Sequence, residues 1–194
     1  METDKKKLRK LFRDARKAVS KTERKQAQTV IVRRLKPWIK RGKRIALYWP
    51  AGSEADLRAL MDTAQQRGAK IYLPFIEKKQ RRLWFTPYRR GAAKARGGWA
   101  GIPQFAGKRL RAEHLDVMIL PLIAADRNGV RLGQGGGFYD ASLERAKFRR
   151  PCKIGAGFAC QLAESALPHE AHDMRLDGFV SERHNLRFRR NGKP

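Results

Sequence analysis

The sequence predicts an α/β fold, a three-layer sandwich in which helices cover both faces of a mainly parallel sheet. Short apolar runs alternate with segments of helical periodicity. The apolar run over 115–121 is continuous, which is typical of a strand buried on both faces. The 194 residues, 41% of them hydrophobic, suffice for one core, so we expect a single domain over 1–194.

Two basic helices over 4–36 open the chain, and we expect both to pack on the sheet. Apolar residues recur at helical spacing over 4–18, which predicts the first helix. Ser20 followed by Glu23 is a capping-box pattern that begins the second helix. Pro37 should end that helix or kink it.

The next elements alternate between strand and helix. A buried strand is predicted over 44–49. A helix over 54–67 follows, and Gly68 is expected just beyond its C-terminus. The second strand covers 70–73, and Pro74 should stop it.

The second half of the chain begins with an edge strand over 83–88, because Pro87 cannot donate to a neighbouring strand. Residues 89–111 are rich in Gly, Arg and Lys and predict a long connection. The remaining elements are a strand over 115–121, a helix over 141–147 and a strand over 153–158.

The charge of the chain is strongly positive. Forty-five Lys and Arg residues against 18 Asp and Glu residues give +27. Residues 1–44 carry 18 basic and 4 acidic side chains, a net of +14, and residues 77–111 carry 11 and 1, a net of +10. Such a field suits a nucleic acid or a small polyanionic substrate. It also arises from proteome-wide bias without any partner, and composition alone does not choose among these interpretations.

Several classes of protein are disfavoured. Cys152 and Cys160 suggest no disulfide framework and no catalytic cysteine signature. The charged first ten residues lack the apolar region of a signal peptide. No apolar run approaches the roughly 18 residues of a membrane-spanning helix. We therefore expect a cytoplasmic protein with no membrane partner.

The run from Arg131 to Asp140 is the most informative motif, because four of its residues (133, 135, 136 and 137) are glycines. Glycines let backbone N–H groups approach a phosphate, and a helix start adds a positive dipole end. The arginine offers a fork for phosphate oxygens, and the aspartate offers an oxygen ligand for Mg²⁺. The run matches neither a Walker loop nor a dinucleotide fingerprint, and an ordinary glycine-rich turn is the alternative.

Other candidates are weaker when each is taken alone. Lys5 and Arg9 share a helix face that could reach phosphates or could simply be solvated. Trp49 could stack on a flat heterocycle and Glu54 could accept from its N–H groups, or they could be a core residue and a helix-start charge. Asp173 could complete a Mg²⁺ site with the aspartate of the glycine run. The histidines 169 and 172 have metal-pair spacing but no evident third ligand.

Together these residues resemble the 5-formyltetrahydrofolate cyclo-ligase family, also called methenyltetrahydrofolate synthetases, over roughly residues 5–182. The resemblance depends on the 131–140 run and on a set of shorter matches in the same order. These are Lys5-x-x-Leu8-Arg9, Tyr48 to Glu54, Ile71-Tyr72-Leu73-Pro74, Gly101-Ile102-Pro103, Leu115-Asp116 to Pro121, and Gly157 to Asp173.

The resemblance implies an enzyme of one-carbon metabolism that uses ATP and Mg²⁺ to close 5-formyltetrahydrofolate into 5,10-methenyltetrahydrofolate, releasing ADP and phosphate. Phosphorylation of the formyl oxygen would make it a leaving group, and N10 of the folate would then attack. No protein nucleophile is needed, which agrees with a chain that has phosphate-binding motifs and no catalytic triad.

The resemblance also assigns roles to residues. Arg131 and Asp140 would be catalytic, and Asp140 with Asp173 would hold Mg²⁺. The ATP site would contain Lys5, Arg9, Arg131, Leu132, Gly133, Gln134, Gly135, Gly136, Gly137, Phe138 and Tyr139. The folate site would contain Trp49, Glu54, Gln134, Gly135, Gly136, Gly137 and Phe138.

The chain departs from the family pattern at three positions. Phe105 follows Ile102-Pro103-Gln104 where a proline is common, and Ala125 occupies a position often held by Phe. Gln134 stands where the family often has a larger side chain. We expect a monomer whose basic segment over 77–111 favours polyglutamylated folate, and nucleic acid is not required. The alternative is a basic nucleic-acid-binding protein, although no RNP, zinc-finger or helix-turn-helix signature is present.

Overall fold

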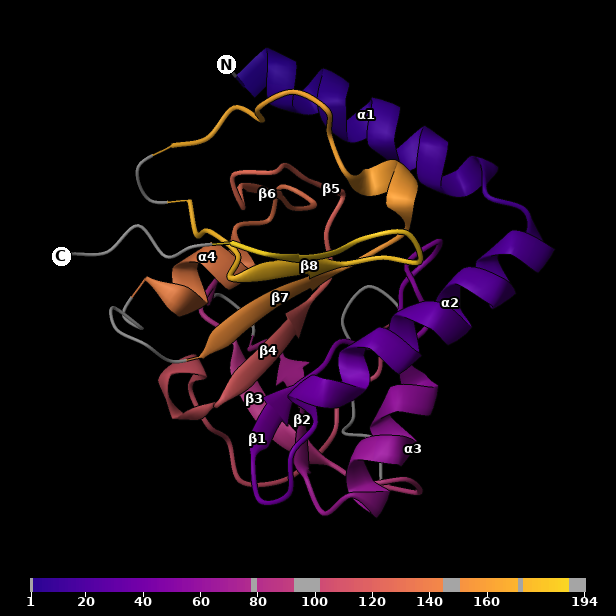
Figure 1. Cartoon of the computed structure of the whole chain (residues 1–194). Coiled ribbons are helices and arrows are strands. Elements are labelled where there is room, and N and C mark those ends of the chain that lie inside the picture. Colours follow the sequence, from indigo (N-terminus) through magenta and orange to yellow (C-terminus); the bar gives the residue numbers. More distant parts are fainter. Residues whose placement is uncertain (1, 78–79, 93–101, 145–150, 171–172, 189–194) are drawn as a thin grey trace, which may run out of the picture.

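The computed structural model of the chain describes residues 2–77, 80–92, 102–144, 151–170 and 173–188. Its centre is a seven-stranded sheet in the order β3-β2-β1-β4-β7-β8-β9 (Figure 1). Adjacent inner strands run parallel, and both edge strands are antiparallel to their neighbours, which confirms the mainly parallel sheet. The strands are β1 Arg44–Ala46, β2 Lys70–Phe75, β3 Trp84–Tyr88, β4 Val117–Leu120, β7 Cys152–Ala156, β8 Gly178–Val180 and β9 Asn185–Arg187.

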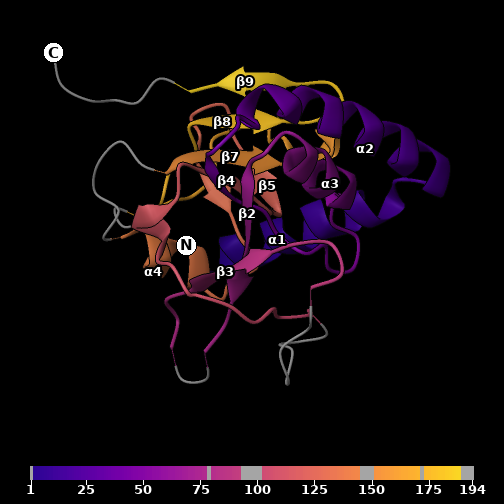
Figure 2. The same ribbon diagram turned by 90° about the horizontal axis from the view of Figure 1, so that it is seen from below.

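Helices cover both faces of this sheet, as predicted. α2 and α3 pack on one face, where Ile31 and Leu60 are fully buried. α4 lies on the other face (Figure 2). Leu143 of α4 and Ala112 of the short helical turn η2 both belong to the second core cluster. No helix in the described residues has the length and apolar character needed to cross a membrane. The bounds are α2 Lys21–Leu35, α3 Arg58–Gln66, α4 Phe138–Leu143 and η2 Ala112–His114.

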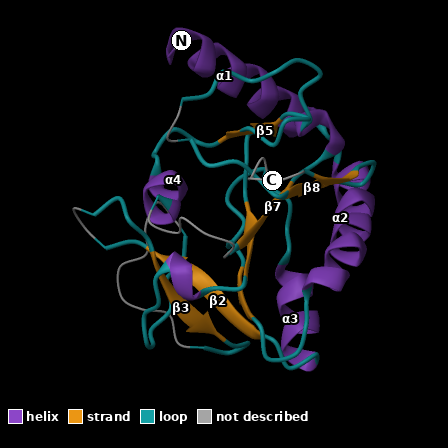
Figure 3. Cartoon of the chain, turned by 60° about the vertical axis from the view of Figure 1, so that its left-hand side comes forward, coloured by secondary structure: helices purple, strands orange, loops and turns teal. Residues whose placement is uncertain are grey.

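The first helix, α1 Glu2–Ala18, has a different position. It lies beside a small second sheet made of β5 and β6 (Figures 1 and 3). Leu8 and Phe12 of α1 pack against the buried cluster that includes Leu132 of β6. We expected both N-terminal helices on the main sheet; α2 lies there, whereas the narrow apolar stripe of α1 covers the smaller sheet. The small sheet pairs β5 Ala124–Ala125 with β6 Arg131–Leu132.

Local sequence signals set several boundaries. The predicted capping box of α2 is present, since Glu23 N donates to Ser20 Oγ at 3.3 Å and Ser20 N donates to Glu23 Oε2 at 3.0 Å. Gly68 follows α3 with φ of 73°, a conformation that favours glycine. α3 begins later than predicted, because a tight turn in which Glu54 N donates to Ala51 O at 3.1 Å precedes it.

The two strand prolines have different outcomes. Pro87 lies in β3, which is an edge strand as predicted. The prediction that Pro74 stops β2 is wrong, because β2 continues to Phe75. Backbone groups two residues apart in a strand point to the same side. Leu47 N donates to Tyr72 O at 3.0 Å, so the backbone nitrogen of Pro74 also points toward β1. β1 has already ended there, and the missing N–H of the proline costs no ladder bond.

Other element boundaries also differ from the predictions. The strand expected over 44–49 ends at Ala46. The helix expected over 141–147 begins earlier, at Phe138, and its residues 145–147 lie outside the described residues. Residues 93–101 of the expected connection, including Gly101, also lie outside them. The short strands β5, β6, β8 and β9 were not predicted, because two or three residues carry little periodicity.

Candidate active site

The glycine-rich loop connects β6 to α4. Gly135 and Gly137 have φ of 101° and 65°, a left-handed backbone that favours glycine. A Cβ on Gly133 would lie 2.9 Å from Nη1 of Arg131, closer than real side chains approach. The loop thus needs glycine both for backbone conformation and for the close approach of a guanidinium group. These requirements go beyond those of a tight turn.

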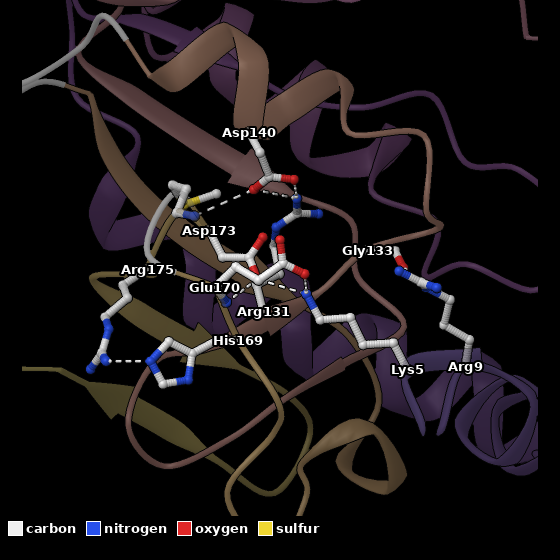
Figure 4. Close-up of polar contacts among 10 residues, drawn as sticks. Lys5, Arg9, Arg131, Gly133, Asp140, His169, Glu170, Asp173 and Arg175 are labelled. Carbon is white, nitrogen blue, oxygen red and sulfur yellow. Dashed lines mark hydrogen bonds and ion pairs between the residues drawn. The ribbon is translucent and has the colours of Figure 1, made fainter. Parts of the chain in front are cut away.

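Arg131 is a buried cation at the base of this loop. Its Nη2 donates to Oδ1 and Oδ2 of Asp140 at 3.2 and 3.0 Å, and its Nη1 donates to Pro121 O at 3.3 Å (Figure 4). Its Nε is buried and has no acceptor among the described residues. The guanidinium is therefore held in place at the base of the loop by Asp140 and Pro121.

Two more cations project from one face of α1 toward the loop (Figure 4). Lys5 Nζ donates to Glu170 Oε1 at 2.9 Å and to Asp173 Oδ2 at 3.0 Å, and Arg9 Nε donates to Gly133 O at 3.2 Å. Burial alone would lower the pKa of Lys5, but the hydrogen bonds to the two carboxylates outweigh burial and hold this pKa above its usual value. The four-residue spacing thus directs both side chains into the same cavity, Arg9 to the loop and Lys5 to the carboxylates of Glu170 and Asp173.

Trp49 and Glu54 form a different part of the site, beyond the end of β1. The Trp49 ring packs on Tyr88 and Phe105, with ring centroids 6.0 and 5.7 Å apart. Glu54 accepts a hydrogen bond from Gln134 Nε2 at 3.4 Å, and burial raises the pKa of its carboxyl group. A half-buried carboxylate near an indole ring suits a flat heterocycle that carries N–H groups.

A single cavity of about 570 Å³ joins these groups, within the size range of small-molecule sites. It opens where several parallel strands end, which is the usual ligand position in such sheets. All the residues to which the resemblance assigns a role line this cavity. They are Lys5, Arg9, Trp49, Glu54, Arg131, Leu132, Gly133, Gln134, Gly135, Gly136, Gly137, Phe138, Tyr139, Asp140 and Asp173.

The cavity also contains residues that the sequence analysis did not select. Glu170 binds Lys5, and its position three residues before Asp173 was an available signal. Tyr48 lines the wall and its hydroxyl donates to Ala55 O at 2.9 Å, but its sequence context is that of an ordinary core residue. Arg81 adds a further cation to the lining.

The two carboxylates expected to hold Mg²⁺ lie in this cavity. Asp140 and Asp173 line the same cavity, and each is bonded to a basic side chain. Within the described ranges, no three His, Cys, Asp or Glu side chains gather into a self-sufficient metal site. Arg175 Nη2 donates to His169 Nε2 at 3.1 Å, and His172 falls outside the described residues. Two carboxylates suit Mg²⁺ when phosphate oxygens supply further ligands.

Fold and site together define an α/β protein whose glycine-rich loop, surrounded by cations, has the chemistry of a phosphate-binding site and lies in one cavity with an aromatic and carboxylate subsite. The chain belongs to the 5-formyltetrahydrofolate cyclo-ligase family, whose model matches residues 1–182. This membership confirms the resemblance and favours a ligase over a nucleic-acid-binding protein as the explanation of the loop.

Individual relatives agree with the family assignment. The chain is 31% identical to the 5-formyltetrahydrofolate cyclo-ligase of Mycolicibacterium smegmatis, with 75% of this chain and 76% of the relative covered. It is 31% identical to that of Escherichia coli K12, with 71% and 76% covered. The solved structure of 5,10-methenyltetrahydrofolate synthetase from Aquifex aeolicus matches with a TM-score of 0.82 at 30% identity, covering 98% of this chain and 95% of the other.

Proposed function

We propose that this chain catalyses the ATP-dependent cyclisation of 5-formyltetrahydrofolate to 5,10-methenyltetrahydrofolate, with release of ADP and phosphate. The family membership supports this reaction. The structural observation that supports it most is the shared cavity, which has phosphate-binding groups in one part and Trp49 with Glu54 in another. A phosphoryl group can pass between two substrates only when both occupy one site.

The glycine-rich loop and the cations around it would hold the ATP phosphates. Backbone N–H groups over 133–139 would approach the phosphate oxygens, and Arg131, Lys5 and Arg9 would supply positive charge. Lys5 and Arg131 are paired with carboxylates in the structure. Binding of the nucleotide would therefore exchange internal ion pairs for contacts to phosphate.

The chemistry needs position and charge rather than a protein nucleophile. The formyl oxygen attacks the γ-phosphorus, and ADP leaves. N10 then attacks the activated carbon, loses its proton, and phosphate leaves with the former formyl oxygen. Arg131 and Lys5 would stabilise charge on the transferred group, and Trp49 and Glu54 would orient the pterin so that the formyl oxygen faces the phosphates.

Mg²⁺ fits this site through Asp140 and Asp173, which line the cavity next to the phosphate-binding residues. When bound, the ion would neutralise part of the phosphate charge. Glu170, which also binds Lys5, would keep that ammonium group close to both carboxylates and to the phosphate chain.

A coupled assay tests the proposal. Protein mixed with ATP, Mg²⁺ and 5-formyltetrahydrofolate should produce the near-ultraviolet absorbance of the methenyl product together with an equal amount of ADP. R131K should lower turnover about 100-fold, a typical loss for one charge-stabilising group. R34K is the matched control, because Arg34 binds the carbonyl of Ser181 and does not line the cavity. A folded protein that makes neither product would exclude the function.

The cavity lining also supports a preference for polyglutamylated folate. Arg81 belongs to the basic segment over 77–111 and lines the cavity. A glutamate tail adds carboxylates that such a cation can bind. The polyglutamate form should therefore have a lower KM than the monoglutamate at low salt, and R81Q should reduce the difference. Equal KM values for both forms would contradict this part of the proposal.

A further inference from the structure

A deeply buried arginine lies behind the cavity. Arg16 of α1 is only 3% exposed. Its Nε donates to Ser53 Oγ at 2.9 Å, and its Nη1 donates to Leu122 O at 3.3 Å. Ser53 precedes Glu54 in the turn after β1, and Leu122 follows β4 directly after Pro121. One guanidinium group therefore joins α1 to the segments that follow two parallel strands.

Arg24 of α2 holds the same turn from its backbone. Its Nη1 donates to Ser53 O at 2.6 Å, and its Nη2 donates to Arg16 O at 2.8 Å. Its guanidinium lies 4.8 Å from the centroid of the Phe158 ring. Ser53 is thus bound through its side chain by one arginine and through its carbonyl by the other. The turn over 51–54 is fixed relative to both N-terminal helices.

The end of β4 connects this turn to the phosphate-binding residues. The consecutive carbonyl groups of Pro121 and Leu122 accept hydrogen bonds from Arg131 and Arg16, at 3.3 Å each. Gln161 Nε2 also donates to Leu122 O at 2.7 Å and fixes that carbonyl. The adjacent carbonyl groups of Pro121 and Leu122 therefore set the separation between the guanidinium groups of Arg131 and Arg16.

We propose that Arg16 is a positioning residue, which holds the turn carrying Glu54 at a fixed distance from the helix carrying Lys5 and Arg9. This inference rests on the proposed function, in which these groups bind folate and ATP respectively. Arg16 does not line the cavity, so it acts through Ser53 rather than on a substrate. Phosphoryl transfer between two bound substrates depends steeply on their spacing, and a displacement of about 1 Å can cost on the order of 100-fold in rate.

The charge of Arg16 has a second, electrostatic consequence. It lowers the pKa of Glu54, although burial has the larger and opposite effect. Gln134 also lowers this pKa through its hydrogen bond. Burial, and to a lesser extent the charge of Glu54, raises the pKa of Tyr48 and of Tyr139, so both hydroxyl groups stay neutral. Arg16 is thus the cation that acts most directly on Glu54 in the described residues.

Kinetics of matched variants test the positioning role. R16K keeps the charge but loses the fork that reaches two acceptors, so the KM for 5-formyltetrahydrofolate should rise about tenfold and turnover should fall. The KM for ATP should change far less, because the contacts of Lys5 with Glu170 and Asp173 and of Arg9 with the loop do not involve Arg16. S53A removes only the Oγ acceptor and should act in the same direction. R34K makes the same arginine-to-lysine change at a backbone-binding residue elsewhere and should leave all constants unchanged.

The pH profile separates charge from position. R16M removes the positive charge, so the acid limb of kcat/KM should move to higher pH, whereas R16K should keep the wild-type profile. Hydrogen exchange without substrate gives a readout independent of catalysis. The amides of Ala51 and Glu54, which are bonded within the turn, should exchange faster in R16K and S53A than in R34K.

The results can reject the positioning role of Arg16 and the proposed function separately. Unchanged exchange of these amides in R16K, or an equal rise of both KM values, would overturn the positioning role. Absence of methenyl product with the unaltered protein rejects the proposed function instead, and the exchange experiment still tests whether Arg16 fixes the turn.

Discussion

Arg131 donates to both carboxylate oxygens of Asp140, nine residues further along the chain, at 3.2 and 3.0 Å (Figure 4). One partner precedes the glycines and the other follows them, so the ion pair closes the loop. The side chain of Arg131 is 4% exposed and that of Asp140 is 23% exposed. The loop is therefore organised without a bound phosphate, and in the proposed function a nucleotide would compete with the Asp140 carboxylate for Arg131.

Asp140→Asn should separate nucleotide binding from turnover. The amide keeps the shape of the side chain but removes the charge that competes for Arg131. Without divalent cation, the affinity for ATP should therefore rise about fivefold, in the range of a partly exposed ion pair. With Mg²⁺, turnover should fall about 100-fold, because the same carboxylate is a proposed metal ligand.

Calorimetric titration of ATP with and without Mg²⁺ measures this effect. Asp62→Asn on α3, which does not line the cavity, is the control and should change neither quantity. Weaker binding of ATP by D140N in the absence of Mg²⁺ would contradict the competition between carboxylate and phosphate.

The sequence predicts those parts of the site whose residues are close in the chain. Arg131, the glycines and Asp140 are nearly contiguous, so their proximity requires no knowledge of the fold. Lys5 and Arg9 share a helix face because of the helical repeat. The contact of Arg9 with Gly133, 124 residues away, is a tertiary contact that no local pattern contains. Only the family resemblance could supply it.

Features that depend on tertiary burial were not predictable. Arg16 has the sequence context of any basic residue on an amphipathic helix, and its burial arises because α1 packs against the segments after β1 and β4. Glu170 belongs to the site because it binds Lys5, 165 residues away in the chain, and no local pattern predicts that contact. The prediction for Pro74 was wrong because β1 ends at Ala46, so no partner strand needs the N–H that proline lacks. The length of a neighbouring strand cannot be read from local propensity.

Lys5→Met should weaken ATP binding, because it removes a buried ammonium group from the phosphate region. The KM for ATP should rise about tenfold, in line with the loss of one charge-assisted contact, and the KM for folate should change less. Lys6→Met is the matched control, since Lys6 is the next residue on the same helix and is exposed. Initial rates at varied ATP measure the effect. Equal KM values for ATP in the two variants would show that Lys5 serves only α1 docking.

Gly133→Ala should disturb the site without unfolding the protein. The new Cβ would approach the Arg131 guanidinium to 2.9 Å, and the guanidinium cannot move freely because Pro121 and Asp140 hold it. Turnover should fall at least about tenfold through this displacement. Gly91→Ala is the control, because Gly91 has a positive φ but open space around it. That variant should lose some stability and keep its kinetics, whereas normal kinetics in G133A would mean that the guanidinium position is not critical.

Glu54→Gln should raise thermal stability at neutral pH. Burial raises the pKa of Glu54 above its ordinary value of 4.5. Between these two pKa values the folded protein keeps a proton that the unfolded chain releases, so this residue lowers stability as pH rises through that window. Above the window the ionised, half-buried carboxylate remains a constant penalty. A glutamine has no ionised form and avoids the penalty.

Melting curves of the two proteins should therefore diverge at pH 7 and converge near pH 4. The same substitution should raise the KM for 5-formyltetrahydrofolate about tenfold, because an amide oxygen accepts less strongly than a carboxylate. Glu164→Gln changes an exposed carboxylate and should alter neither property. A gain in stability together with a loss of folate affinity would show that the carboxylate is kept for recognition at the expense of stability. If E54Q melts below the wild type at pH 7, the carboxylate instead stabilises the turn, and its role in folate binding loses this support.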